Sequence, residues 1–405
     1  MACALWIVAS EPAQGRLDSV AIEEATGIRG ATVRWLATTP AVADAIDPAL
    51  YAAGALVLLG GGGSAALVAF VLAFYLWSSV LTLTTSHHTL VALQTALIGL
   101  LGARWSDTWS IDAWIRQRTP GPADRRYGFA IWLPGFVLGI CFLAAAWSKL
   151  DGGVDWVLNG TVRYHFVSDL DQAWVTWGPR IASLPGVAVV MSAVAVAVEA
   201  IVITGSFVPA TRWRALCGLL AASLLAGFAV FQGVVWPGWW VLLLSFLPWQ
   251  LVRSSAVALG SAAIGRLQYA LVLAIVIAQA GVSAARREVP PLLSAYDMYS
   301  TTYSTPEEYE WASNLEYRVA AQADGRWVTL DGCVVDDVIA GRVREAMAAA
   351  APVPSPMRAV LARCLRVQGA SAWRLEGDRR VYDWAAGVFV WKRGIDVIGP
   401  IETVR

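Results

Sequence analysis

The chain has 405 residues, of which 57% are hydrophobic and 15% charged, and its mean hydropathy is +0.56. Soluble domains carry about 25% charged residues, so this composition excludes an ordinary soluble protein and indicates a polytopic membrane protein. The 30 acidic and 30 basic residues balance, which gives no indication of a nucleic-acid partner. The five cysteines show no zinc-binding spacing, so no metal site is predicted.

Apolar segments predict an all-α polytopic membrane bundle of about eight spanning or half-spanning helices, because a full span needs about 20 residues. They lie at 48–59, 65–84, 88–102, 129–149, 184–206, 213–233, 236–252 and 265–285. Residues 1–47 form an N-terminal segment whose apolar stretch, Met1 to Ser10, predicts only a partial helix. The transmembrane domain is therefore expected over 48–285.

Residues 286–405 are polar and predict a small soluble α+β domain. Period-two alternation indicates strands within 316–330 and 372–398, and helices are expected at 334–350 and 356–366. Cys333 and Cys364 lie in this domain and could pair if it faces an oxidising compartment.

Loop charge predicts the orientation. The loops at 102–128, 207–214 and 253–266 hold nine arginines, whereas the alternate loops hold only Arg163 and Arg180, with Lys149 at the edge of one. Because cytoplasmic loops accumulate positive residues, the first set is predicted to be cytoplasmic. The alternate loops and the C-terminal domain are then extracytoplasmic, and the protein is a multi-pass protein surrounded by membrane lipid.

Lys149 is a candidate base. Of the 30 basic residues only Lys149 and Lys392 are lysines, and Lys149 ends a long apolar segment. A partly desolvated lysine can lose its proton, which an arginine cannot. The alternative is a snorkelling lysine whose ammonium lies among the lipid headgroups.

The three histidines fall on the same side of the membrane as Lys149 in this topology. His87 and His88 occupy the outer turn before one helix, and His165 lies in the outer loop after Lys149. Histidine is easily poised near neutral pH, so these residues are candidates to polarise a substrate or shuttle protons. An interfacial position without chemistry is the alternative.

Two further features lie near this side. Glu199 stands inside an apolar helix, where a carboxylate usually faces the bundle or a cavity. It is expected to hold the bundle, paired with an arginine or a hydroxyl, or to position a catalytic partner. The loop 150–183 is rich in aromatic residues, including Trp156 and Tyr164. It either roofs a cavity suited to a lipid quinol or anchors the chain in the interface.

Several short elements together resemble a known membrane family. Trp109-Ser110-Ile111-Asp112 resembles the W-S-hydrophobic-D element shared by vitamin K-dependent gamma-carboxylases and bacterial HTTM (horizontally transferred transmembrane) proteins. Upstream, Ser86 to Leu90 carries the histidine pair, and Ser148-Lys149-Leu150 is followed by Trp156 and Gly160 as in the family. Further along the chain, Glu199 precedes Arg212 as in the family, and the stretch Tyr296 to Tyr299 follows the last apolar segment. The resemblance covers roughly residues 45–300.

The resemblance implies an integral membrane gamma-carboxylase-like enzyme, a lyase of the bacterial inner membrane with an outward-facing site. In the carboxylases the lysine matching Lys149 deprotonates vitamin K hydroquinone, and the histidine matching His88, or His87, supports quinol- and oxygen-linked carboxylation of a peptide glutamate. His165, Trp156 and Tyr164 would then bind substrate, and Glu199, Trp109 and Asp112 would be structural. A peptide or protein at the outer face is the implied partner, and a lipid quinol the implied cofactor.

The chain also departs from the family. The carboxylases carry another histidine in the helix matching 213–233, and no histidine stands there in this chain. The long C-terminal region of the animal enzymes is replaced by about 120 residues, which is the length of 286–405. The alternative function is therefore a non-catalytic scaffold, accessory subunit or transporter with the same fold.

Overall fold

The protein, seen as a computed structural model, divides into two compact units, Met1–Thr302 and Tyr303–Arg405. The residues described are 2–10, 27–82, 88–102, 110–115, 128–168, 170, 172–208, 210–248, 265–287, 289, 292–296, 299–312, 315–335, 337–353, 355–364 and 371–402. The division lies further along the chain than residue 286, where the polar composition begins, because the residues that follow the last long helix pack back into the first unit.

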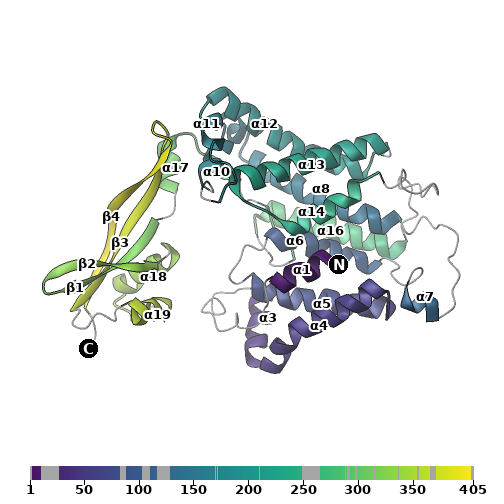
Figure 1. Ribbon diagram of the computed structural model, residues 1–405, viewed down its shortest axis with the longest axis horizontal. Helices are drawn as coiled ribbons and strands as arrows, with labels where there is room; N and C mark the ends of the chain where they lie inside the picture. The colour runs from purple at the N-terminus through teal and green to yellow at the C-terminus, as the bar shows by residue number, and fades with distance from the viewer. Residues whose placement is uncertain are drawn as a thin grey trace. The chain divides into compact units, whose positions relative to one another are not determined.

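The first unit is helical (Figure 1). Its elements are α1 (Ala2–Ser10), α3 (Gly27–Thr38), α4 (Pro40–Leu59), α5 (Gly63–Leu81), α6 (His88–Gly99), η1 (Leu100–Gly102), α7 (Ile111–Ile115), α8 (Gly128–Leu150), α9 (Asp155–Leu158), α10 (Val162–Ser168), α11 (Gly178–Ala182), α12 (Pro185–Ile201), η3 (Val202–Ser206), α13 (Thr211–Gln232), α14 (Pro237–Leu242), η4 (Leu243–Phe246) and α16 (Arg266–Ala285).

Six helical stretches of the described chain are long and apolar enough to cross a membrane, namely α4, α5, α8, α12 with η3, α13 and α16. Two shorter apolar helices, Leu90–Gly99 and Pro237–Phe246, accompany them. The prediction of a multi-pass helical membrane protein is thereby confirmed. The short helices correspond to the segments 88–102 and 236–252.

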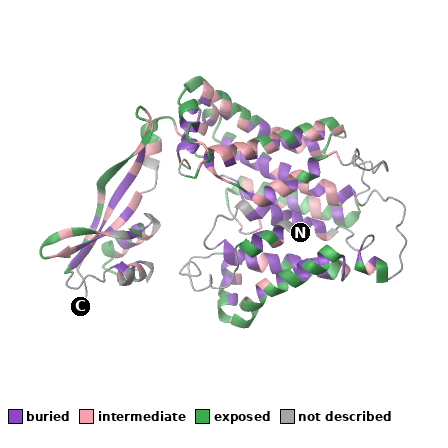
Figure 2. Ribbon diagram, in the orientation of Figure 1, coloured by how far each residue is buried: buried purple, intermediate pink, exposed green. Residues whose placement is uncertain are grey.

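Helix α8 is the centre of the bundle. In its most apolar stretch 67% of residues are buried, against 22% in α16, and it packs against α6, α12, α14 and α16. Figure 2 shows buried residues where helices of this unit face one another and exposed residues along the outer side of α4. Close packing depends on small residues, since a Cβ atom at Gly139 would stand only 2.7 Å from the Ile203 Cα.

Helices α4 and α5 form a hairpin around a glycine turn (Figure 1). Gly60 ends α4 in a left-handed conformation with φ of +68°, and the N–H groups of Gly60 and Gly61 donate to the carbonyls of Val57 and Leu56. Glycine adopts this conformation without steric cost. The turn falls in the gap between the expected segments 48–59 and 65–84, although α4 begins at Pro40, earlier than the expected residue 48.

After α16 the chain returns into the bundle as an irregular segment, 292–296. Its backbone carbonyls accept hydrogen bonds from three side chains of apolar helices: Thr95 donates to Leu292 (3.0 Å), Gln279 to Ser294 (2.7 Å) and Ser148 to Ala295 (3.0 Å). Non-helical backbone inside a membrane protein has to be satisfied by the protein itself. The polar residues of α6, α8 and α16 meet that requirement.

The second unit is an α+β domain, as predicted. It contains α17 (Pro306–Ala312), β1 (Leu315–Ala323), β2 (Arg326–Val335), α18 (Asp337–Ala348), α19 (Ser355–Cys364), β3 (Ala372–Asp383) and β4 (Val388–Glu402). The strands form an antiparallel sheet in the order β2-β1-β3-β4.

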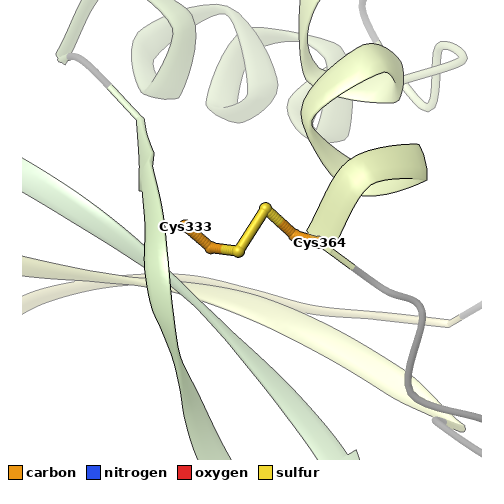
Figure 3. Close-up of a disulfide and its surroundings, with 2 residues drawn as sticks. All are labelled: Cys333 and Cys364. Carbon is orange, nitrogen blue, oxygen red and sulfur yellow. A yellow bond between two sulfur atoms is a disulfide. The ribbon is translucent and has the colours of Figure 1, made fainter.

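One core joins the sheet of the second unit to α18 and α19, with Val319, Trp373 and Leu375 buried against Ala340 and Met357. Cys333 in β2 and Cys364 at the end of α19 form a disulfide across it (Figure 3). The pairing considered from the sequence is therefore present.

We predict that the Cys333→Ser/Cys364→Ser double variant unfolds more easily in its second unit. The disulfide closes a loop of 31 residues, and loss of such a constraint on the unfolded chain costs about 3–4 kcal/mol. Pulse proteolysis of the purified full chain in a urea series measures this change. An unaltered midpoint for cleavage of the second unit would contradict the expectation, and Cys3→Ser, which leaves the bridge intact, is the control.

Candidate functional site

Lys149 and Glu199 form a buried ion pair between α8 and α12. The Lys149 Nζ donates to both Glu199 carboxylate oxygens, at 2.8 and 2.9 Å, and lies 3.4 Å from the Ala145 carbonyl of the preceding turn. The two side chains are 5% and 2% exposed, so Lys149 does not snorkel to the headgroups. The partner of Glu199 is a lysine, whereas the sequence suggested an arginine or a hydroxyl.

Aromatic side chains enclose the amine. The Trp156 ring centre lies 5.4 Å from the Lys149 Nζ, and the Trp156 indole N–H donates to the Tyr299 carbonyl at 2.7 Å. The His165 ring stands between Trp156 and Tyr299, with centroid distances of 6.3 and 4.8 Å. We call Lys149, Glu199, Trp156, His165 and Tyr299 the ion-pair cluster.

Three separate parts of the chain supply the ion-pair cluster besides α8 and α12. Trp156 lies in α9, His165 in α10, and Tyr299 beyond the irregular segment. Gly160 turns the chain between α9 and α10 with φ of +61°, where its Cα lies against Ala188 at the start of α12. The loop that follows Lys149 thus folds back over the end of α8.

Burial, together with the positive charge of Lys149, lowers the pKa of His165 to about 3, although a hydrogen bond with the Tyr299 backbone acts in the opposite direction. A buried imidazole is costly to charge. His165 is therefore neutral at pH 7, and it can exchange hydrogen bonds with a bound molecule without adding a second positive charge beside Lys149.

A cavity of about 440 Å³ lies next to the ion-pair cluster, between α8, α12 and α16. Its walls are mainly apolar, with Trp147, Leu150 and Val276 among them, and Gln279 and Ser283 supply the polar atoms. Ala146 and Ala200 line the cavity and also pack against Trp156. These two alanines are therefore shared by the cavity and by the cluster around Trp156.

Tyr164 is buried and engages Arg163 through its side chain. The Arg163 guanidinium donates to the Tyr164 hydroxyl at 2.7 Å and stacks 4.6 Å from the ring centre. Of the three residues expected to bind substrate, Trp156 and His165 thus belong to the ion-pair cluster, while Tyr164 is engaged with its neighbour.

His87 and the side chain of His88 lie outside the described residues, as does Trp109. The backbone of α6 still indicates where His88 stands. Gly99 abuts Leu133 near the start of α8, whereas Thr95 bonds to Leu292 in the segment that also bonds Ser148 near the end of α8. Helix α6 therefore runs antiparallel to α8 and begins, at His88, toward the end that carries Lys149.

Asp112 contacts the α4–α5 turn. Its Oδ1 accepts a hydrogen bond from the Gly62 N–H at 3.1 Å, and its own N–H lies 3.4 Å from the Gly60 carbonyl. This contact places α7 at the end of the hairpin opposite to the α5 terminus that precedes the histidines. It is a structural contact, and the length of α5 separates it from the end of the bundle that carries Lys149.

Tyr299 is the member of the ion-pair cluster that sequence reasoning did not assign to the site. The sequence did contain a signal for it, because Tyr299 ends the Tyr-Asp-Met-Tyr element. Both tyrosines of that element have left-handed backbones, with φ of +53° at Tyr296 and +62° at Tyr299. Tyr296 accepts a hydrogen bond from the Cys141 Sγ at 2.9 Å and contacts Trp239. The element thus inserts two aromatic rings into the helical unit.

Among the residues that the structure describes, no three His, Cys, Asp or Glu side chains converge where they could hold a metal ion.

We predict that Glu199→Gln destabilises the protein by roughly 3–5 kcal/mol, because it leaves the Lys149 ammonium buried without its counter-charge. Adding Lys149→Met should restore much of the stability, since a neutral pair of similar volume avoids the desolvation of charge. Unfolding in detergent, followed for both variants, measures these changes. A double variant as unstable as Glu199→Gln would show that the ion pair is not the cause.

We predict that His165 makes stability depend on pH in acid. The unfolded state binds a proton at the ordinary value of 6.5, but the folded state binds it only near pH 3. Stability from this residue is complete above pH 6.5 and falls by about 1.4 kcal/mol per pH unit between these values. His165→Gln should flatten the dependence measured by unfolding between pH 4 and 6.5. An equal slope in both proteins would contradict the buried neutral state.

Comparison of the chain with known proteins gives no match: no protein-family model, curated protein or solved structure corresponds to it.

Proposed function

We propose that the protein is an HTTM- and gamma-carboxylase-like integral membrane enzyme that performs acid–base chemistry on a lipid-soluble quinol, with the ion-pair cluster as its centre. The observation that carries this proposal is the buried Lys149–Glu199 pair beside an apolar cavity of about 440 Å³. Intramembrane ionisable residues are costly and usually serve a function.

Lys149 can act as a base even though Glu199 holds it. Movement of a proton across the 2.8 Å hydrogen bond converts the ammonium and carboxylate into a neutral amine and a neutral acid. Two charges are costly in an apolar interior, which favours this transfer of the proton. The neutral Lys149 then accepts the hydroxyl proton of the substrate, and Glu199 keeps the proton that Lys149 gave up.

The remaining residues of the ion-pair cluster suit a ring-bearing lipid. The apolar walls of the cavity match an isoprenoid tail, and the aromatic side chains of Trp156 and Tyr299 are of the kind that stack on a flat ring. His165 is neutral and hydrogen-bonding, which fits the orientation of a quinol hydroxyl. His88, and His87 beside it, would assist from the start of α6. Peptide glutamate is the second substrate that the family resemblance implies.

The site is proposed to face away from the cytoplasm of a bacterial inner membrane. The excess of arginine in the loops at 102–128, 207–214 and 253–266, on the opposite side of the membrane from Lys149, supports this orientation. The Cys333–Cys364 disulfide supports an oxidising compartment for the second unit. A peptide or protein substrate would then approach from the outside.

A non-catalytic membrane scaffold is the second candidate. It is favoured by the full engagement of the Lys149 ammonium with two carboxylate oxygens and the Ala145 carbonyl. In this alternative the ion pair only fixes α8 against α12. The two candidates differ in whether a neutral replacement of the pair retains function.

We predict that quinol-dependent oxygen uptake by the purified protein in lipid nanodiscs falls by roughly 10² or more in Lys149→Met, the usual effect of removing a general base. Lys149→Arg should be equally inactive, because it keeps the charge but stays protonated. Both rates are compared with that of the natural protein at matched folded concentration.

The Lys149→Met/Glu199→Gln variant separates folding from chemistry. If it folds normally and remains inactive, the loss of activity in Lys149→Met comes from the chemistry of the pair and not from misfolding. If it folds normally and takes up oxygen at the natural rate, Lys149 is not the base. The absence of quinol-dependent uptake by the natural protein would favour the scaffold.

A further inference from the structure

Helix α7 is fastened to the α4–α5 turn by its polar residues. Asp112 bonds to Gly62, as described above, and the Ser110 hydroxyl accepts a hydrogen bond from the Ala113 N–H at 3.0 Å. A Cβ atom at Gly60 would stand 2.2 Å from the Ser110 Cβ, so the turn and the start of α7 are in direct contact. Ala113 is buried against this turn.

The opposite side of α7 is apolar and exposed. Ile111, Trp114 and Ile115 are 41%, 81% and 65% exposed. Their spacing of i, i+3 and i+4 places them on one face of the helix. A single exposed apolar residue needs no explanation, but three on one helical face, held outward by a polar attachment on the other, form a surface that favours an apolar environment.

This face continues the lipid-facing surface of the hairpin. Leu58 and Leu59, at the end of α4 beside the turn, are 54% and 56% exposed, as expected for side chains that contact acyl chains. Because α4 and α5 are each long enough to cross the membrane, their turn lies at the bilayer surface. The sequence on either side of α7 carries Arg104, Arg116 and Arg118, which complement anionic headgroups.

We propose that α7 is a membrane-surface anchor, with Ile111, Trp114 and Ile115 inserted into the headgroup boundary of the leaflet that holds the α4–α5 turn. Tryptophan favours this depth because its ring is apolar and its indole N–H is polar. The occupant of the exposed face is therefore the lipid bilayer. The anchor is independent of the chemistry proposed for Lys149.

The test uses an environment-sensitive fluorophore on Ile115→Cys in a Cys3→Ser background, reconstituted as the full chain in phosphatidylcholine vesicles with a minor share of phosphatidylglycerol. Ile115 is solvent-exposed, so its replacement spares the fold. Doxyl lipids labelled near the headgroup should quench the probe strongly, and aqueous iodide weakly. The control probe, at Ala386→Cys in an exposed turn of the second unit, should show the reverse.

Strong quenching by iodide at position 115 would overturn the proposal. Resistance to both quenchers would also overturn it, because it would indicate a protein surface over α7. A Trp114→Ser substitution beside the same probe supplies the second measurement. If the membrane interface binds the apolar face of α7, iodide quenching of the probe should rise at least severalfold in the Trp114→Ser protein. An unchanged value would show that Trp114 does not anchor the helix.

Discussion

The arrangement of the helical unit depends on the ion pair between Lys149 and Glu199. Each charge alone would be costly in an apolar bundle, and together they are tolerated only in a geometry that lets both carboxylate oxygens accept from the ammonium. This requirement fixes the end of α8, the most buried of the six long apolar helices described, against the last turn of α12. It also sets the place where Trp156 covers the amine, and hence where the loop after Lys149 folds back.

A buried ion pair is weak evidence for stability, because apolar residues of similar volume often stabilise a protein as well or better. Its persistence in so apolar a chain therefore needs another reason, either a fixed helix register or chemistry. The position of the pair favours chemistry. The pair lies under Trp156, whose neighbours Ala146 and Ala200 line the cavity, and near a histidine that burial keeps neutral. An ion pair that only fixed the register of α8 against α12 would need neither the cavity nor the neutral histidine nearby.

The sequence allowed the helices and the α+β unit to be predicted, because hydropathy and periodicity are local properties. It placed the start of α4 too late, since Asp44, Asp47 and Pro48 make a helical stretch look polar. It could not pair Lys149 with Glu199, which are 50 residues apart, because side-chain pairing is set by the packing of α8 on α12. The place of Tyr299 in the ion-pair cluster could not be predicted for the same reason, because the irregular segment that leads to it has no periodicity.

That irregular segment explains the polar residues of the apolar helices. Thr95, Ser148 and Gln279 belong to α6, α8 and α16, and each donates to a carbonyl between Leu292 and Ala295. Trp156 does the same for Tyr299. Unpaired carbonyls are costly in an apolar interior. Removal of any of these donors would therefore weaken the attachment of the irregular segment to the helices, and with it the position of Tyr299. The polar residues of three spanning or half-spanning helices thus support the ion-pair cluster indirectly, because they satisfy the backbone carbonyls of the segment that leads to Tyr299.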